Sequence, residues 1–368
     1  MISTSSVILA VLTACPQDLE QPLTPLEGDQ APASWAEALA AGEPWVDLRL
    51  RGESVGVPGM DDRAMALTLR GAVGLASAPY RGFSIGVELE GVTDFGVDTY
   101  NDTLNGDTSR PIIADPAGFE LNQAWAHYES SRGYSLRLGR QILNLGNGRF
   151  VGSEPWRQNN RTFDALTLTH VHTSRLLLTA AYVYNVNGVT GSSSPAGDVE
   201  SDSLLLHASY PLGESGMAEA YMYDLDLDNP LLPSTRTLGA RVEVDVDVLG
   251  KGLDFQGEFA NQRDSGVNSE QVDAGYAHLS LGAQFAAITY TLGTEILQGS
   301  DVPGNTLTTP LGSVHSFNGL ADMFATTPLQ GLDDTYYPLP GDCTQLQRAA
   351  PYPHSYPFSA SQLSRPAP

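Results

Sequence analysis

Arginine is concentrated in one short stretch of an otherwise acidic chain. Residues 131–161 (SRGYSLRLGRQILNLGNGRFVGSEPWRQNNR) contain one acid, Glu154, whereas the whole chain has a formal net charge of −24. The six arginines of this stretch are Arg132, Arg137, Arg140, Arg149, Arg157 and Arg161. A guanidinium stays charged at physiological pH, and its planar fork fits a carboxylate. The cluster therefore indicates recognition of an anion; the alternative is that it neutralises the chain's own Asp and Glu side chains.

Two further motifs have the composition of reactive sites. Residues 82–86 (GFSIG) match the nucleophile-elbow pattern of hydrolases, with Ser84 in the position of the nucleophile. The motif lies within an alternating strand pattern and not on a strand-to-helix turn, so a hydrolase is only an alternative. His170 and His172 could share a metal ion, but the sequence indicates no third ligand. We expect no metal and no cofactor.

The composition excludes several classes of protein. The 368-residue chain has no linker between Trp45 and Tyr337 and no apolar run near the roughly eighteen residues of a membrane-spanning helix, so we expect one domain of another kind. The net charge of −24 argues against binding nucleic acid through its phosphates. The two cysteines, Cys15 and Cys343, predict neither a disulfide framework nor a metal site.

From Trp45 onward the sequence has the period of two that is typical of β-strands. In the first segment, Val46, Leu48 and Leu50 share one face and charged residues occupy the other. Strands are expected at about 45–54, 65–75, 83–94, 119–129, 134–142, 162–171, 175–186, 202–210, 217–225, 236–248, 253–260, 271–280 and 283–292, and a further one begins at Asp333.

The connections between these strands alternate in length. Short turns are expected at 79–81, 130–133, 172–174, 211–216, 249–252 and 281–282, and the intervening connections are longer and polar. Short and long ends never exchange places, which is typical of an outer-membrane barrel with tight periplasmic turns and long external loops. We therefore predict an all-β, antiparallel up-and-down transmembrane β-barrel of 13–14 strands with a periplasmic N-terminus. A soluble β-sandwich is the alternative, although its connections need not segregate by length.

In such a barrel the charged face of each strand must line the lumen, because an arginine facing lipid at mid-depth costs about 2–4 kcal/mol. The strand arginines expected to point into the pore are Arg49, Arg51, Arg70 and Arg137. Acids such as Glu88, Glu243 and Glu258 lie on other strands, so separate positive and negative sectors are expected.

The connection at 143–161 is long enough to fold inward and narrow the pore. It carries Arg149, Arg157 and Arg161 together with Trp156 and several Asn, Gln and Gly residues. Of the arginines of the 131–161 cluster, only Arg137 and Arg140 are expected to have acidic strands within reach. The three loop arginines are therefore the first candidates for binding an anion.

Several segments of the chain resemble the alginate-export family of outer-membrane porins. They are 120–124 (ELNQA), 138–141 (LGRQ), 149–152 (RFVG), 156–159 (WRQN) and 162–165 (TFDA). The segments 100–103 (YNDT), 114–116 (ADP) and 315–319 (HSFNG) also resemble family segments. The likeness extends from about Trp45 to Tyr336. Together these motifs are specific for the family but not for alginate as the cargo.

The resemblance implies a closed barrel through which an anionic polysaccharide of uronic acids passes passively along an arginine-lined constriction. It assigns anion binding to Arg137, Arg140, Arg149, Arg157 and Arg161, and the strand pattern adds Arg49, Arg51 and Arg70 as wall charges. The expected partners are an anionic polysaccharide or small anionic solutes, outer-membrane lipid and periplasmic export components. A general charge-selective porin for small solutes is the alternative.

The two ends of the chain differ from the barrel pattern. Residues 1–17 resemble a secretory signal segment, although the apolar run is short and no Lys or Arg precedes it. Residues 18–43 are expected to be a periplasmic segment whose short helix begins at Ser34 and stops at Gly42. The barrel is expected to span 44–337. Residues 338–368 are rich in proline and do not alternate, so we expect a non-native or disordered tail, produced by a frameshift or truncation that removed the closing strands.

Overall fold

A computed structural model describes residues 31–336 of the protein except 58, 61, 173–174, 214, 249–250, 267–270, 286–287 and 319–323. The expected signal segment, the Pro-rich tail and both cysteines lie outside the described residues. Within the described part of the chain, no helix has the length and apolar character needed to cross a membrane.

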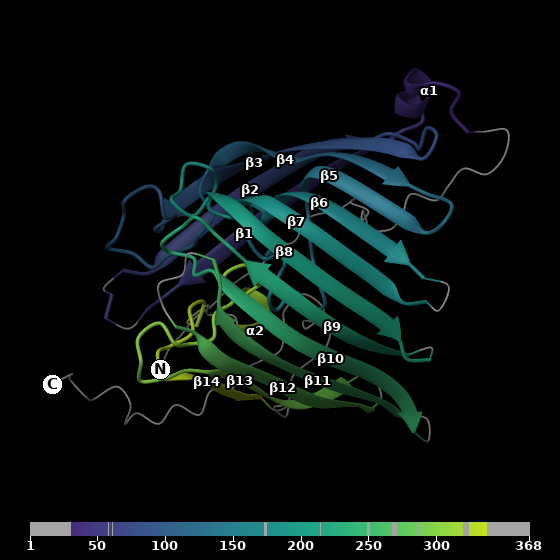
Figure 1. Cartoon of the computed structure of the whole chain (residues 1–368). Helices are drawn as coiled ribbons and strands as arrows, with labels where there is room; N and C mark the ends of the chain where they lie inside the picture. Colours follow the sequence, from purple (N-terminus) through teal and green to yellow (C-terminus); the bar gives the residue numbers. More distant parts are fainter. Residues whose placement is uncertain are drawn as a thin grey trace.

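The described residues form a fourteen-stranded antiparallel sheet in which each strand from β1 to β13 pairs with the next one in the sequence (Figure 1). Among the described residues β14 does not pair with β1, so the closed barrel that the resemblance implies is not formed by these strands alone. The strands are β1 (Glu43–Val55), β2 (Ala64–Ala76), β3 (Phe83–Thr99), β4 (Gly118–Glu129), β5 (Tyr134–Gln141), β6 (Thr162–Val171), β7 (Leu177–Asn187), β8 (Asp198–Pro211), β9 (Gly216–Leu225), β10 (Thr235–Val248), β11 (Lys251–Asp264), β12 (Asp273–Phe285), β13 (Ile288–Gln298) and β14 (Gly331–Tyr336). The predicted all-β, up-and-down architecture is confirmed.

Short and long connections segregate to opposite ends of the sheet, as the sequence predicts. In Figure 1 the turns lie at the right and the long loops at the left. A short helix, α1 (Trp35–Ala40), begins after its N-cap Ser34 and lies at the turn end. There the Ala78 amide donates to the Ala38 carbonyl over 2.9 Å, so α1 is held against the β2–β3 turn.

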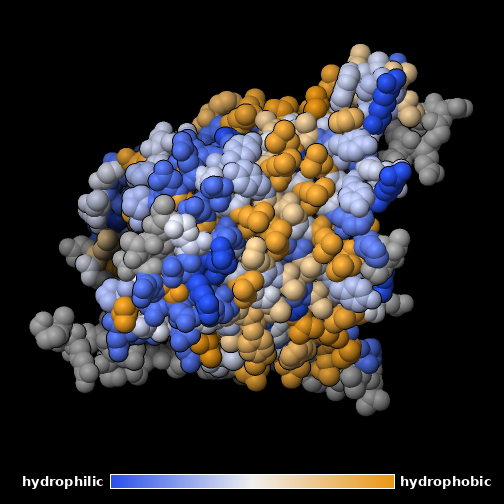
Figure 2. Space-filling view, viewed as in Figure 1, coloured by the Kyte–Doolittle hydropathy of each residue, from blue (hydrophilic) through white to orange (hydrophobic). Residues whose placement is uncertain are grey.

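The two faces of the sheet differ as expected for a membrane barrel. On β1, Val46 and Leu48 are more than half exposed, whereas the alternate residue Arg51 is 1 % exposed. Exposed apolar side chains recur on the outer face of the later strands, and buried charged side chains such as Arg70 and Glu88 point inward. Figure 2 shows the apolar side chains gathered into a broad region across the strands, beside hydrophilic loops. This distribution matches the lipid-facing band of a transmembrane barrel.

One predicted turn is misplaced. The expected turn at 281–282 lies inside β12, which continues to Phe285. Gly282 pairs with Asp254 of β11, and a Cβ at Gly282 would lie 1.6 Å from the Asp254 Oδ2 atom. The glycine therefore makes room for a side chain of the neighbouring strand and does not mark a turn.

Aromatic rings lie over glycines on neighbouring strands of the sheet. Trp125 of β4 is directly opposite Gly86 of β3, and a Cβ at Gly86 would lie 2.3 Å from the indole ring. Similar contacts join Trp45 to Gly74, Tyr221 to Gly239 and Tyr336 to Gly293. These pairs are aromatic–glycine contacts of the kind that pin strand register.

We expect Gly86→Ala to destabilise the folded chain by about 1–3 kcal/mol, because the new methyl group must displace the Trp125 ring from a packed position. Urea unfolding followed by tryptophan fluorescence measures this loss. The matched control is Gly91→Ala on the same strand, where the nearest atom to an added Cβ is 3.4 Å away. Equal stability of the two variants would contradict the prediction.

Candidate functional site

The connection between β5 and β6, residues 142–161, folds into the interior of the curved sheet. It contacts β1 and β2 through its 155–158 segment, β11 through Asn147 and β13 through Arg149. A loop held by strands so far apart in the sheet must cross the interior. The predicted inward fold of this loop is confirmed.

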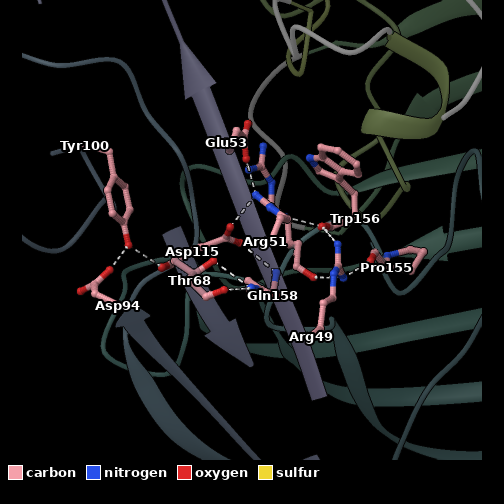
Figure 3. Close-up of polar contacts among 11 residues, drawn as sticks. Arg49, Arg51, Glu53, Thr68, Asp94, Tyr100, Asp115, Pro155, Trp156 and Gln158 are labelled. Atoms are coloured by element: carbon pink, nitrogen blue, oxygen red, sulfur yellow. Dashed lines mark hydrogen bonds and ion pairs between the residues drawn. The ribbon is translucent and has the colours of Figure 1, made fainter. Parts of the chain in front are cut away.

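Two arginines of β1 hold the tip of the loop (Figure 3). The Arg49 guanidinium donates to the carbonyl oxygens of Pro155, Trp156 and Arg157 at 2.8, 2.6 and 3.1 Å. Arg51 also donates to the Trp156 carbonyl, and its guanidinium carbon lies 5.0 Å from the centre of the Trp156 ring. Both arginines therefore donate to carbonyl oxygens of the protein's own backbone.

A buried acid connects this tip to the wall. Asp115, which is fully buried, lies 2.5 Å from the Arg51 guanidinium. It also accepts a hydrogen bond of 2.8 Å from the backbone N–H of Gln158. The Gln158 side chain donates to the Thr68 hydroxyl on β2 at 2.8 Å. The carbonyl of Asp115 accepts from the Tyr100 hydroxyl, whose pKa is raised by burial. The tip is thus held by a layer of charge-assisted and neutral hydrogen bonds.

A second loop, residues 299–330, packs on the first and contains the helix α2 (His315–Asn318). Val151 and Leu311 form a parallel β-bridge, and the Trp156 and His315 rings stack with centres 3.8 Å apart. Arg161 donates to the carbonyls of Gly152 and Gly312 at 2.9 and 3.1 Å, so it joins the two loops. Complete burial lowers the pKa of the Arg161 guanidinium, an effect that the nearby Glu154 opposes.

Glu258 of β11 and Glu295 of β13 hold the 147–149 segment of the first loop, on the side of the sheet opposite β1. Arg149 is fully buried, and its Nε lies 2.9 Å from a Glu295 oxygen, which also accepts a hydrogen bond from Tyr276. Glu258 accepts from Asn147 at 2.9 Å and from the Tyr221 hydroxyl at 2.7 Å. The loop is therefore anchored by charged groups at both sides of the interior.

Apolar side chains fill the space between the loops and one wall. Leu145, Phe150 and Val151 of the first loop and Leu307 and Leu311 of the second belong to one buried cluster. The cluster includes inward-facing residues of the wall from β6 to β13. Part of the interior cross-section is therefore occupied by a packed core, which narrows the space left for a passage.

The structure divides the predicted site arginines into three groups. Arg51, Arg70, Arg149 and Arg161 are buried and bound to groups of the protein. Arg49, Arg137 and Arg157 are half-buried on the inner side: Arg137 lies over the Trp125 ring at 4.7 Å, and Arg157 is 3.9 Å from Glu53. The eighth arginine, Arg140, lies elsewhere.

Arg140 lies on the outer face of β5, and its expected position in the pore wall is wrong. It shares its side of the strand with the exposed Leu136 and Leu138, whereas its neighbour Gln141 is buried. Its guanidinium pairs with Asp164 of β6 at 2.7 Å, close to the long-loop end of both strands. An arginine this close to the ends of the strands can place its guanidinium among the polar headgroups of the membrane. Its charge therefore does not require a position in the lumen.

The expected separation into positive and negative sectors is also wrong, because acids and arginines alternate on neighbouring strands. Arg70 of β2 contacts Asp47 of β1 and Glu90 of β3. Arg241 of β10 lies 2.7 Å from Glu219 of β9 and also contacts Glu243. The expectation that the loop arginines lack acidic strands within reach fails for the same reason, as the Arg149–Glu295 pair shows.

The other two motifs show no reactive arrangement. The Ser84 hydroxyl is 3.4 Å from the His127 Nδ1 atom, but the His127 Nε2 atom lies 2.7 Å from the Ser135 hydroxyl and not beside a carboxylate. His170 stacks on Tyr134 with ring centres 4.1 Å apart. Among the described residues, no group of three His, Cys, Asp or Glu side chains could hold a metal ion.

Sequence reasoning missed the acids that anchor the loop, Asp115, Glu258 and Glu295. Glu258 and Glu295 look like ordinary inward-facing strand acids, so only the folded loop distinguishes them. Asp115 could have been found, because it lies in the family-like segment 114–116 outside any strand. The segment 315–319 likewise indicated the second loop, whose His315 contacts Trp156.

Comparisons with solved structures show the same fold. OccAB2 of Acinetobacter baumannii aligns with a TM-score of 0.59 at 15 % identity, covering 82 % of this chain and 76 % of its own. OpdL of Pseudomonas aeruginosa aligns with a TM-score of 0.56 at 16 % identity, covering 81 % and 75 %. OccK2 (OpdF) of P. aeruginosa, solved in complex with glucuronate, aligns with a TM-score of 0.51 at 15 % identity, covering 72 % and 66 %. A search of curated proteins found no match.

The sequence also matches a family described as alginate export, over residues 87–293. This range includes the inward-folded loop 142–161 and more than half of the chain. Together with the fourteen-stranded sheet and the porin-like fold, the match assigns the protein to the outer membrane as a channel. The chain belongs to the alginate export family.

Proposed function

We propose that this channel passes anionic, uronate-containing carbohydrate passively across the outer membrane, with a polymer such as alginate as the cargo. The observation that carries the proposal is that Arg49, Arg137 and Arg157 stay half-buried on the inner side of the sheet, whereas Arg51, Arg70, Arg149 and Arg161 are buried. Half-buried guanidiniums can attract a passing carboxylate, and their dispersed positions avoid a single tight binding site. The family match supports uronate as the cargo class.

The channel is proposed to lie with its short turns and α1 in the periplasm and its long loops outside, which is the usual arrangement of such barrels. In this orientation the N-terminal segment faces the side from which an exported polymer would arrive. Periplasmic export components are the expected partners on that side, and lipid surrounds the apolar outer face.

A second candidate is a charge-selective porin for small anionic solutes. It is favoured by the apolar core that fills part of the interior, because a narrowed passage suits a small solute better than a polymer. The glucuronate complex of OccK2 adds that a protein of similar fold binds a monomeric uronate.

Block of single-channel current tests both candidates. We expect oligomeric alginate at micromolar concentration to block the wild-type current in a planar bilayer, and Arg137→Gln/Arg157→Gln to weaken the block by about tenfold, since each lost charge contributes roughly 1 kcal/mol or less at a wet site. Arg236→Gln is the matched control, because this arginine is exposed and pairs with Asp224 near the long-loop end. Block by glucuronate alone would favour the small-solute porin, and indifference to both anions would reject uronate as cargo.

A further inference from the structure

An open groove on the outer face of β5–β10 has no part in the channel. Its volume is about 740 Å³. Its lining includes Tyr134, His170, Leu178, Leu206, Met222 and Leu238. Pockets for small molecules typically have about 300–1,000 Å³, so the groove is large enough to hold part of a ligand.

The groove opens toward lipid. Leu178, Leu206 and Leu238 are 42 %, 38 % and 55 % exposed and point away from the interior, as alternation along their strands requires. Ala208 and Ala220 lie between these larger side chains and leave the floor low. A hydrocarbon chain in such a groove would contact apolar side chains on several sides.

One end of the groove lies at the short-turn end of the barrel. Tyr134 begins β5 and His170 lies next to the end of β6, and their rings stack. The His170 Nδ1 atom is 3.1 Å from the Gly133 carbonyl in the β4–β5 turn. The groove therefore extends from the short turns toward the apolar band of the outer face.

Cationic side chains lie at this end. The Val171 amide donates to the Gly133 carbonyl at 2.9 Å, which places the β4–β5 turn beside the end of β6 and the turn that follows it. Arg132 in the first turn and Arg175 in the second are both exposed. A nearby acid in the described part of this region is Glu129, the last residue of β4, and it is half-buried.

We propose that this groove binds an anionic glycerophospholipid of the inner leaflet, with an acyl chain in the groove and the phosphate at Arg132 and Arg175. The apolar groove matches the acyl chain, and the guanidiniums match the phosphate in charge and hydrogen-bond geometry. The inference rests on the proposed orientation, because only a periplasmic position of the short turns places these arginines at the inner leaflet.

Titration with single lipids tests this site. The full chain in detergent is titrated with dioleoylphosphatidylglycerol or dioleoylphosphatidylcholine, and bound lipid is counted by native mass spectrometry. We expect the wild type to bind phosphatidylglycerol about tenfold more tightly than phosphatidylcholine, since each arginine near a membrane surface contributes on the order of 1 kcal/mol. Arg132→Gln/Arg175→Gln should remove this preference and leave phosphatidylcholine binding unchanged.

A substitution that fills the groove provides the second arm. Ala220→Trp should weaken binding of both lipids, whereas Ala126→Trp, an exposed outward alanine on β4 outside the groove, should bind both like the wild type. Equal affinity of the wild type for the two lipids, or unchanged binding by Ala220→Trp, would overturn the proposal. Single-channel current is recorded for the same proteins. If uronate does not block the current but the lipid preference is present, only the proposed cargo is rejected. If uronate blocks the current but the lipid preference is absent, only the lipid site is rejected.

Discussion

Replacing Arg149 with alanine is expected to lower the free energy of unfolding by about 3–5 kcal/mol, because the change leaves Glu295 as a buried carboxylate without its cation. Arg149 is fully buried and pairs with Glu295 at 2.9 Å. Its guanidinium carbon also lies 4.9 Å from the centre of the Phe317 ring, so the alanine variant loses packing between the two inner loops as well. Urea unfolding of the refolded barrel in detergent measures the effect.

Two further variants separate the buried charge from general damage. Arg149→Met/Glu295→Gln removes both charges and keeps side-chain volume, so it should be clearly more stable than Arg149→Ala. Arg236→Ala breaks an exposed pair with Asp224 and should cost about 1 kcal/mol or less. If Arg149→Ala were no more destabilising than Arg236→Ala, the pair with Glu295 would not anchor the loop.

The double replacement Arg49→Gln/Arg51→Gln is expected to raise the single-channel conductance by about twofold or more, because it releases the tip of a loop that occupies the interior. The two guanidiniums supply the hydrogen bonds to the carbonyls of Pro155, Trp156 and Arg157. Loss of the Arg51 charge also leaves Glu53 and Asp115 as buried acids that repel one another. Both effects disfavour the docked position of the tip.

Conductance in a planar bilayer, recorded with variants that retain heat-modifiable migration on gels, measures this release. Arg81→Gln is the control, since Arg81 lies in the β2–β3 turn over the Tyr80 ring and away from the loop. A folded double variant with wild-type conductance would show that the 155–158 segment does not limit the passage.

The architecture could be predicted from the sequence because it depends on local patterns. Alternation of apolar and charged residues determines which face of each strand meets lipid, and the difference in connection length determines the up-and-down order. The failures are local as well. Gly282 resembles a turn residue but makes room for Asp254, and Arg140 resembles a wall residue although it shares a face with Leu136 and Leu138.

The candidate site was predictable only in part, because its contacts join residues far apart in the chain. The sequence indicated that the arginines of 131–161 matter and that the connection after β5 folds inward. It did not indicate that Arg149 pairs with Glu295, or that Arg49 and Arg51 bind the backbone around Trp156. Such pairs require the barrel to curve and bring β1 and β13 toward one loop.

By itself, then, the sequence determined the strands, their inner and outer faces, the inward loop and the family resemblance, since each follows from short-range pattern. Only the tertiary structure decided which arginines are buried against groups of the protein. Burial beside acids such as Asp115 and Glu295 commits Arg51 and Arg149 to holding the loop, and Arg49 donates to the loop backbone. Arg137 and Arg157 stay half-buried on the inner side. The physical reason is that a charge is accessible or neutralised according to its neighbours in space, and these come from opposite walls of the barrel.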